Sequence, residues 1–207
     1  MPLTQLIARQ LRKPSGFVGK FVFSRLLNRG NAGMNRGALA QLRLAPDDRV
    51  IEVGFGGGDL IARMEPKVPQ GRIAGVDFSQ DMVDVCSRRF ADLLRAGRLE
   101  LRCASVERLP YDAESFTKAC TVNTIYFWPE PLAALVELRR VLRPGGRLVV
   151  CFNPPETLRK VPYTKHGFSF YEPDRVRSLM EEAGFRSVEM VSGTAVLGEF
   201  RCAVGTR

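Results

Sequence analysis

Short apolar runs alternate along most of this chain with longer segments in which apolar residues have helical spacing. The runs predict strands, because a strand covered on both faces is apolar throughout. They cover residues 49–53, 72–76, 98–103, 116–122, a stretch after Gly146, 186–191 and about 198–205. The spaced residues predict helices over 58–65, 80–95, 130–142 and 173–183. This alternation predicts a seven-stranded, doubly wound α/β sheet.

The segment before the first strand has a different character. Its apolar spacing predicts helices over 3–12, 15–28 and 33–44. The first 46 residues carry eight basic side chains and no acidic one, and so hold most of the formal net charge of +9. We predict a basic N-terminal helical cap over residues 1–45 and a second domain over 46–207. The basic face of the cap either meets water or binds an anionic partner such as a lipid headgroup, a phosphorylated metabolite or nucleic acid.

A glycine-rich stretch follows the first strand and reads Val50-Ile51-Glu52-Val53-Gly54-Phe55-Gly56-Gly57-Gly58-Asp59-Leu60. A strand that enters a helix through glycines brings backbone N–H groups close to a ligand, which predicts a nucleotide or nucleoside-like cofactor. The dinucleotide fingerprint would need a third glycine at Asp59, so the stretch does not predict NAD binding. The phosphate loop of nucleotide hydrolases would need Lys and Ser/Thr after the last glycine, and these are also missing.

A second acidic residue, Asp77, ends the second predicted strand about 20 residues past the glycines. A carboxylate in this place holds the two hydroxyl groups of a ribose. Asp77 would otherwise serve as a helix N-cap, but Ser79 can fill that role for the helix that starts near Gln80. We therefore predict that Asp77 binds ribose.

Four stretches resemble, in the right order, the motifs of Rossmann-like (class I) S-adenosylmethionine-dependent methyltransferases. They are Glu52-x-Gly54-x-Gly56-x-Gly58, Gly75-Val76-Asp77-Phe78-Ser79, Ser105-Val106-Glu107-Arg108-Leu109-Pro110 and the turn Leu142-Arg143-Pro144-Gly145-Gly146 before the fifth strand. The resemblance covers about residues 45–205 and implies S-adenosyl-L-methionine as the cofactor. Ser105 and Thr117 stand where the family usually has Asp. Ser105 would be a weak partner for adenine, although the Val106 amide can still serve.

The resemblance also implies where the site residues lie. Cofactor contacts are expected from Glu52, Gly54, Phe55, Gly56, Gly58, Asp77, Phe78, Met82, Ser105, Val106 and Asn123. Tyr126 follows the fourth strand on the side of the methyl group, where an aromatic face can attract a sulfonium or an ammonium. Tyr126 and the lone histidine, His166 in the predicted loop 153–172, are the candidate catalytic residues, with His166 as a possible general base. No metal site is predicted.

One further motif is set aside. Asn153-Pro154-Pro155-Glu156 resembles the Asn/Asp-Pro-Pro-aromatic motif of amino-group methyltransferases. It follows the fifth strand instead of the fourth, and Glu156 replaces the aromatic residue. We interpret it as a rigid start to the loop 153–172. Trp128, which follows Tyr126 by two residues, is not assigned to the site.

The predicted function is methyl transfer from S-adenosylmethionine to a small-molecule or lipid-like acceptor, with an anionic acceptor left open. Two alternatives remain: a nucleic-acid methyltransferase, indicated by the basic segment, and a non-catalytic S-adenosylmethionine-binding regulatory protein. The basic segment also allows peripheral membrane contact. The oligomeric state and the identity of the acceptor do not follow from the sequence.

The expected location is the cytoplasm. Five cysteines without a close pair, four of them on predicted strands, are typical of small core residues in a reducing compartment. No apolar run is long enough to span a bilayer, and Arg9, Arg12 and Lys13 interrupt any signal-peptide core.

Overall fold

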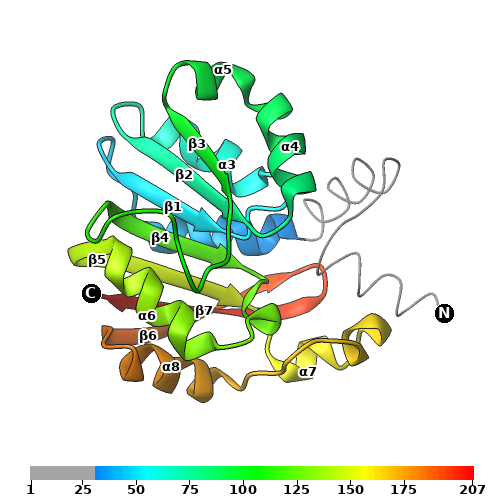
Figure 1. The fold of residues 1–207 in the computed structure, drawn as a ribbon. Helices are drawn as coiled ribbons and strands as arrows, with labels where there is room; N and C mark the ends of the chain where they lie inside the picture. The colour runs from blue at the N-terminus through cyan, green and yellow to red at the C-terminus, as the bar shows by residue number, and fades with distance from the viewer. Residues whose placement is uncertain (1–30) are drawn as a thin grey trace.

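The computed structural model describes residues 31–207, which begin with a helix over 31–42 (Figure 1). The helices predicted for 3–12 and 15–28 lie outside the described residues. Met34, Ala38 and Leu42 are buried in the same apolar cluster as Val50 of the first strand. The helix 31–42 therefore packs directly on the sheet, and the domain boundary at residue 45 stays a prediction.

As predicted, seven strands form one sheet, and the structure gives their order as β3-β2-β1-β4-β5-β7-β6. Their bounds are β1 Arg49–Val53, β2 Arg72–Asp77, β3 Leu99–Cys103, β4 Phe116–Val122, β5 Leu142–Phe152, β6 Arg186–Ala195 and β7 Gly198–Thr206. The pairs among β1 to β5 are parallel, while β7 runs antiparallel to both β5 and β6. The carboxyl ends of β1, β2, β4 and β5 consequently share one edge of the sheet, where ligands bind in this architecture.

Helices cover both faces of the sheet (Figure 1). They are α3 Asp59–Met64, α4 Gln80–Arg89, α5 Ala91–Arg95, α6 Pro131–Val141, α7 Pro155–Leu158 and α8 Pro173–Glu182, with short 3₁₀ turns η1 Glu65–Lys67, η2 Ile125–Phe127 and η3 Pro162–Lys165. The predicted loop 153–172 thus contains α7 and η3. Successive side chains of β1 point to opposite faces of the sheet. Val50 packs in the cluster that contains α3 and α4, and Ile51 packs in the cluster that contains α6 and α8. Within residues 31–207, no helix is long and apolar enough to cross a membrane.

Three local predictions need correction. The helix expected over 80–95 is broken at Phe90, whose backbone leaves the helical region (φ −114°, ψ 30°) and whose ring packs against Gly58. The glycine turn expected before the fifth strand is an irregularity inside β5, where the register with β4 shifts between Leu142 and Arg147. Cys103, expected in the core, is exposed because it ends the edge strand β3; the other four cysteines are buried.

Hydrogen bonds hold Arg207 at the end of the sheet opposite the glycine loop. Its N–H donates to the Gly146 carbonyl (2.8 Å), and its guanidinium donates to Glu114 Oε1 (2.9 Å) and to the Arg140 carbonyl (3.1 Å). These partners precede β4 or lie near the start of β5. Figure 1 shows the C-terminus at this end of the sheet.

Candidate active site

Gly54, Gly56 and Gly58 of the glycine loop differ in the space around them. Gly54, Gly56 and Gly58 have φ values of 73°, 49° and 72°, which side chains other than glycine rarely adopt. A Cβ at Gly54 would lie 2.3 Å from Thr124 Cγ2, and one at Gly58 would lie 2.6 Å from Phe90 Cε2. A Cβ at Gly56 would meet no atom within 4 Å. Gly54 and Gly58 are thus required by internal packing, whereas Gly56 faces open space that a ligand can enter.

Asp77 connects this loop to the end of β2. Its Oδ2 accepts a hydrogen bond from the Gly56 N–H (3.0 Å), and its Oδ1 accepts one from the Ser79 N–H (3.0 Å). Burial raises the pKa of Asp77, while these two backbone donors lower it. Ser79 is the N-cap residue of α4 but makes no side-chain capping bond. Each carboxylate oxygen still has a lone pair that a hydroxyl group can use.

Glu52, at the end of β1, is buried below the loop and is 3% exposed. Among the described residues its Oε2 has no hydrogen-bond partner. Burial, followed by repulsion from Asp77 and Asp59, raises the pKa of Glu52 to about 8. Glu52 therefore carries a proton at neutral pH.

This shift predicts a pH dependence of stability. The folded chain keeps the Glu52 proton between the ordinary pKa of 4.5 and about 8, whereas the unfolded chain loses it. The contribution of Glu52 is therefore fully present below about pH 4.5 and is lost as the pH rises through about 8. We expect wild type to lose on the order of a few kcal/mol of unfolding free energy relative to Glu52→Gln between about pH 5 and pH 8. Urea denaturation at several pH values measures this difference.

Glu181→Gln, which changes an exposed glutamate of α8, serves as the control and should follow the wild-type curve. Parallel curves for wild type and Glu52→Gln would show that Glu52 does not titrate with the predicted shift.

A cluster of amide side chains lies at the carboxyl ends of β4 and β5. Asn123 Oδ1 accepts hydrogen bonds from the Tyr126 hydroxyl (3.0 Å) and from Asn153 Nδ2 (3.0 Å). Asn123 Nδ2 donates to Asn31 Oδ1 (2.7 Å). Asn153 was not assigned to the site from its motif, but as the first residue after β5 it lies next to the first residue after β4. The signal in the sequence is that each of these two asparagines directly follows a strand, and the two strands are parallel neighbours in the sheet.

The helix 31–42 contacts both halves of the site. Met34 Sδ lies 3.1 Å from Asn123 Nδ2, and Asn35 Nδ2 donates to Asp59 Oδ2 (2.9 Å) at the start of α3. Burial raises the pKa of Asp59, but hydrogen bonds from Arg63 and Asn35 lower it more, so the net shift is downward.

Aromatic residues cover Tyr126. The Phe168 ring lies 5.6 Å from the Tyr126 ring and 4.6 Å from the Phe127 ring, centroid to centroid. The Ser169 N–H donates to the Tyr126 carbonyl (3.1 Å). Burial raises the pKa of Tyr126, and its hydroxyl hydrogen is used by Asn123, so this side chain is suited to positioning and not to proton removal. His166 precedes Phe168 in the same loop, and Trp128 is a buried core residue.

The remaining predicted cofactor residues occupy different environments. Phe55 and Met82 are buried in the core cluster beneath the loop, so their side chains support it from below. Phe78 is 45% exposed next to Asp77. Ser105 is exposed, and its Oγ accepts a hydrogen bond from the Glu107 N–H (3.3 Å), whereas Val106 is buried.

These features fit a nucleoside cofactor that carries positive charge. Gly56 offers an open backbone approach beside the Asp77 carboxylate, and three carboxyl groups, Glu52, Asp59 and Asp77, lie close enough to influence one another. The acidic side chains of Asp59 and Asp77 beside the loop disfavour a phosphate and suit a sulfonium or an ammonium, and the unpaired Glu52 oxygen leaves a further polar atom for a ligand. The fold and the loop together define a Rossmann-like cofactor-binding protein of the methyltransferase type.

Comparison with known proteins agrees with this class. The family model described as "Methyltransferase domain" matches residues 51–150. The ubiquinone/menaquinone biosynthesis C-methyltransferase UbiE of Geobacter sulfurreducens is 31% identical over 193 residues, which cover 79% of this chain and 75% of that protein. The chain belongs to the family of class I S-adenosylmethionine-dependent methyltransferases. The family, the fold and the type of cofactor are as predicted.

Two further comparisons show how much of each protein is similar to this chain. UbiE of Geotalea daltonii is 31% identical over 138 residues, which cover 66% of this chain but only 57% of that protein. A solved structure of an S-adenosylmethionine-dependent methyltransferase from Aquifex aeolicus has a TM-score of 0.71 at 20% identity, over 89% of this chain and 97% of its own. The chain thus spans little more than half of the first of these relatives and nearly all of the solved domain.

Proposed function

We propose that this protein transfers a methyl group from S-adenosylmethionine to a small-molecule or lipid-like acceptor. The observation that carries this proposal is the open side of Gly56, whose N–H is held by Asp77 at the carboxyl edge of the sheet. The cluster of Asn123, Tyr126 and Asn153 lies at the same edge, after the adjacent strands. A cofactor held by the first group would direct its reactive end toward the second.

S-adenosylmethionine, when bound, supplies a methyl group on a positively charged sulfur. Residues Gly54 to Gly58 and Asp77 would hold its nucleoside part. Asn123 and Tyr126, fixed by their mutual hydrogen bond, would orient the acceptor, and Phe168 would exclude water. Catalysis would then depend mainly on alignment and water exclusion.

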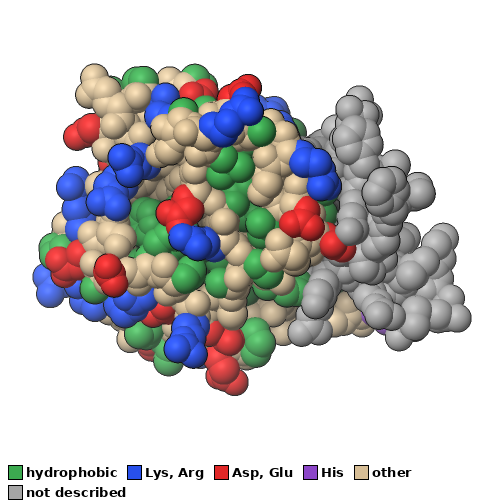
Figure 2. All heavy atoms as spheres, turned by 45° about the horizontal axis from the view of Figure 1, so that its top comes forward, with side chains coloured by type: hydrophobic (Ala, Val, Ile, Leu, Met, Phe, Trp, Pro, Cys, Tyr) green, Lys and Arg blue, Asp and Glu red, His purple; other side chains and the backbone are tan. Residues whose placement is uncertain are grey.

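The acceptor class is supported by the aromatic and amide side chains that gather at this edge of the sheet: Asn123, Tyr126, Asn153 and Phe168. Two relatives are named as C-methyltransferases of ubiquinone/menaquinone biosynthesis, which agrees with a small or lipid-like acceptor. A nucleic-acid acceptor would favour a continuous basic surface, whereas Figure 2 shows acidic and basic side chains interspersed over the described part of the face drawn. The basic residues before Asn31 lie outside the described residues, and contact of that segment with an anionic acceptor or membrane remains a prediction.

The test is to incubate the protein with methyl-labelled S-adenosylmethionine and fractions of a cell extract. We expect S-adenosylhomocysteine to form with the lipid or small-molecule fraction and label to enter that fraction. Product that disappears after RNase treatment would instead support the nucleic-acid alternative. Tight cofactor binding without turnover in any fraction would support the regulatory alternative.

His166→Ala is expected to lower the turnover number by less than about tenfold, since loss of a required general base costs about 10²–10⁴-fold. Initial rates with the acceptor found above measure this effect, with cofactor affinity determined in parallel. A loss of about 10²-fold or more at unchanged affinity would identify His166 as the general base and contradict the positioning mechanism.

A further inference from the structure

The connection between β3 and β4, residues 104–115, forms the wall of the site next to Asp77 and contains no helix. Its first residue, Ala104, donates its N–H to the Asp77 carbonyl (3.1 Å). Ser105 and Val106, the residues expected beside adenine, follow directly. Because Ser105 has a neutral hydroxyl where the family usually has a carboxylate, and one lone pair of its Oγ already accepts the Glu107 N–H, we expect backbone groups of this segment to make the main hydrogen bonds to adenine. Its recognition then depends on what holds the segment in place.

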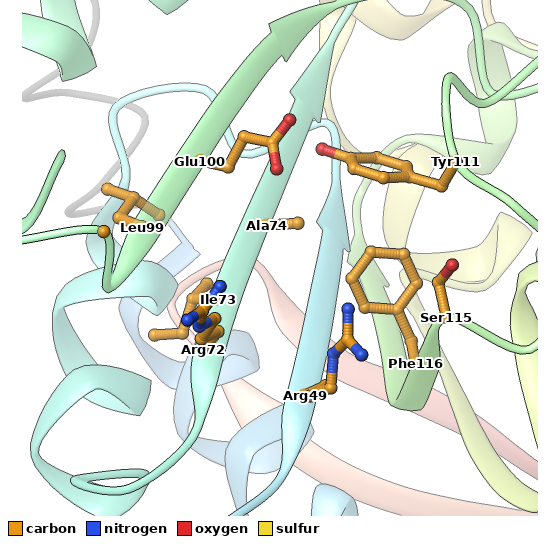
Figure 3. A pocket seen from close by; sticks show the side chains of 10 residues that line it. Arg49, Arg72, Ile73, Ala74, Leu99, Glu100, Tyr111, Ser115 and Phe116 are labelled. Atoms are coloured by element: carbon orange, nitrogen blue, oxygen red, sulfur yellow. The ribbon is translucent and has the colours of Figure 1, made fainter.

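Val106 and Leu109 bury their side chains in the core cluster, whereas the part of the segment beyond Leu109 borders a hollow. The rings of Tyr111 and Phe116 pack edge to face with centroids 5.0 Å apart. They border a hollow of about 120 Å³ over β1, β2 and β3, lined on the strand side by Arg49, Ala74 and Glu100 (Figure 3). The segment is thus held in the core at Val106 and Leu109, and its far end, beyond Leu109, runs beside a hollow.

Helix α6 holds this far end by hydrogen bonds to its backbone. Glu137 Oε1 accepts the Leu109 N–H at 2.7 Å, and Arg140 Nη2 donates to the Tyr111 carbonyl at 2.8 Å. The two side chains also form a bidentate pair, with Arg140 Nε and Nη2 at 2.7 and 2.8 Å from the two oxygens of Glu137. The hydrogen bond from Arg140 lowers the pKa of Glu137, so the carboxylate stays ionised and is a strong acceptor.

We propose that Glu137 is a positioning residue that gives the cofactor site its selectivity for adenine. Together with Arg140 it fixes Leu109 and Tyr111, and thereby the position of the Ser105 and Val106 backbone groups. Hydrogen bonds tolerate only a few tenths of an ångström of displacement before they weaken, so a small shift of this segment would remove the adenine contacts. This inference rests on the proposed binding of S-adenosylmethionine.

The experiment compares two ligands by calorimetry: S-adenosylhomocysteine and S-inosylhomocysteine, in which a carbonyl replaces the 6-amino group of adenine. Wild type should bind the adenine compound more tightly. Glu137→Leu removes both interactions of the carboxylate, and we expect its dissociation constant for S-adenosylhomocysteine to rise by about three- to tenfold, the effect of losing a neutral backbone hydrogen bond to adenine. Binding of S-inosylhomocysteine should change little, so the preference for adenine collapses.

Glu137→Gln keeps an acceptor for the Leu109 N–H and should retain an intermediate preference, which also serves as the informative variant if Glu137→Leu does not fold. Glu182→Leu, which breaks the exposed pair with Arg175 on α8, is the matched control and should keep the wild-type preference. If Glu137 only stabilised the fold, Glu137→Leu would lower the melting temperature and weaken the binding of both ligands equally.

An unchanged preference in Glu137→Leu, or a wild type that binds both ligands equally, would overturn the assignment of Glu137. A wild type that binds neither ligand would instead contradict the proposed function itself.

Discussion

Gly56→Val should abolish detectable binding of S-adenosylhomocysteine while the domain stays folded. A Cβ added at Gly56 meets no protein atom within 4 Å, so the new side chain starts in open space and fills the ligand's approach to the backbone. The substitution also places a β-branched residue at φ 49°, which costs about 1–2 kcal/mol of stability. Calorimetry gives the affinity, and circular dichroism with thermal unfolding reports the fold.

Gly97→Val provides the matched control. Gly97 also has a positive φ, 66°, and an added Cβ there meets nothing within 4 Å, but it lies in the turn between α5 and β3. Both variants should lose similar stability, and only Gly56→Val should lose binding. If Gly56→Val binds the ligand as tightly as Gly97→Val does, the loop is a structural turn and does not contact the cofactor.

Asp77→Ala should weaken cofactor binding by about 1.5–3 kcal/mol, roughly 10- to 150-fold, because it removes a charged acceptor from the ribose hydroxyl groups. The same carboxylate holds the Gly56 and Ser79 N–H groups, so part of the loss could come from a displaced loop. A ligand lacking the 2′-hydroxyl separates the two effects. Calorimetry should show that wild type prefers the ribose form and that Asp77→Ala binds both forms equally weakly.

Asp84→Ala removes a carboxylate of α4 that accepts a hydrogen bond from the exposed Gln80 side chain (2.8 Å), and it should leave both affinities unchanged. If Asp77→Ala still prefers the ribose form by the wild-type factor, Asp77 supports the loop without contacting ribose.

The features that sequence predicts well here are those set by neighbouring residues. The strand β1, the glycines after it and Asp77 were all placed correctly, because apolar runs and positive-φ glycines act over a few residues. The break at Phe90 was missed because helical spacing continues through it, and only the packing of its ring against Gly58 reveals the change in direction. Local patterns therefore predict the order of the helices and strands but not the breaks within a helix.

The amide cluster at the ends of β4 and β5 is harder to predict because it is assembled from distant segments. Asn31, Asn123 and Asn153 meet only once β4 and β5 are neighbours and the helix 31–42 crosses their ends. The family motif that Asn153 resembles belongs after the fourth strand, whereas the order of the strands places Asn153 beside Asn123. The roles of Tyr126 and His166 in catalysis remain predictions.

The anchoring of Arg207 at the far edge of the sheet has a practical consequence for biosensor design. A linker attached after this residue would leave the molecule on the side away from the glycine loop, as the position of the C-terminus in Figure 1 shows. Immobilisation through such a linker orients the carboxyl edge of the sheet toward bulk solution. Ligands and lipid vesicles in the flow would then reach that edge without obstruction by the chip surface.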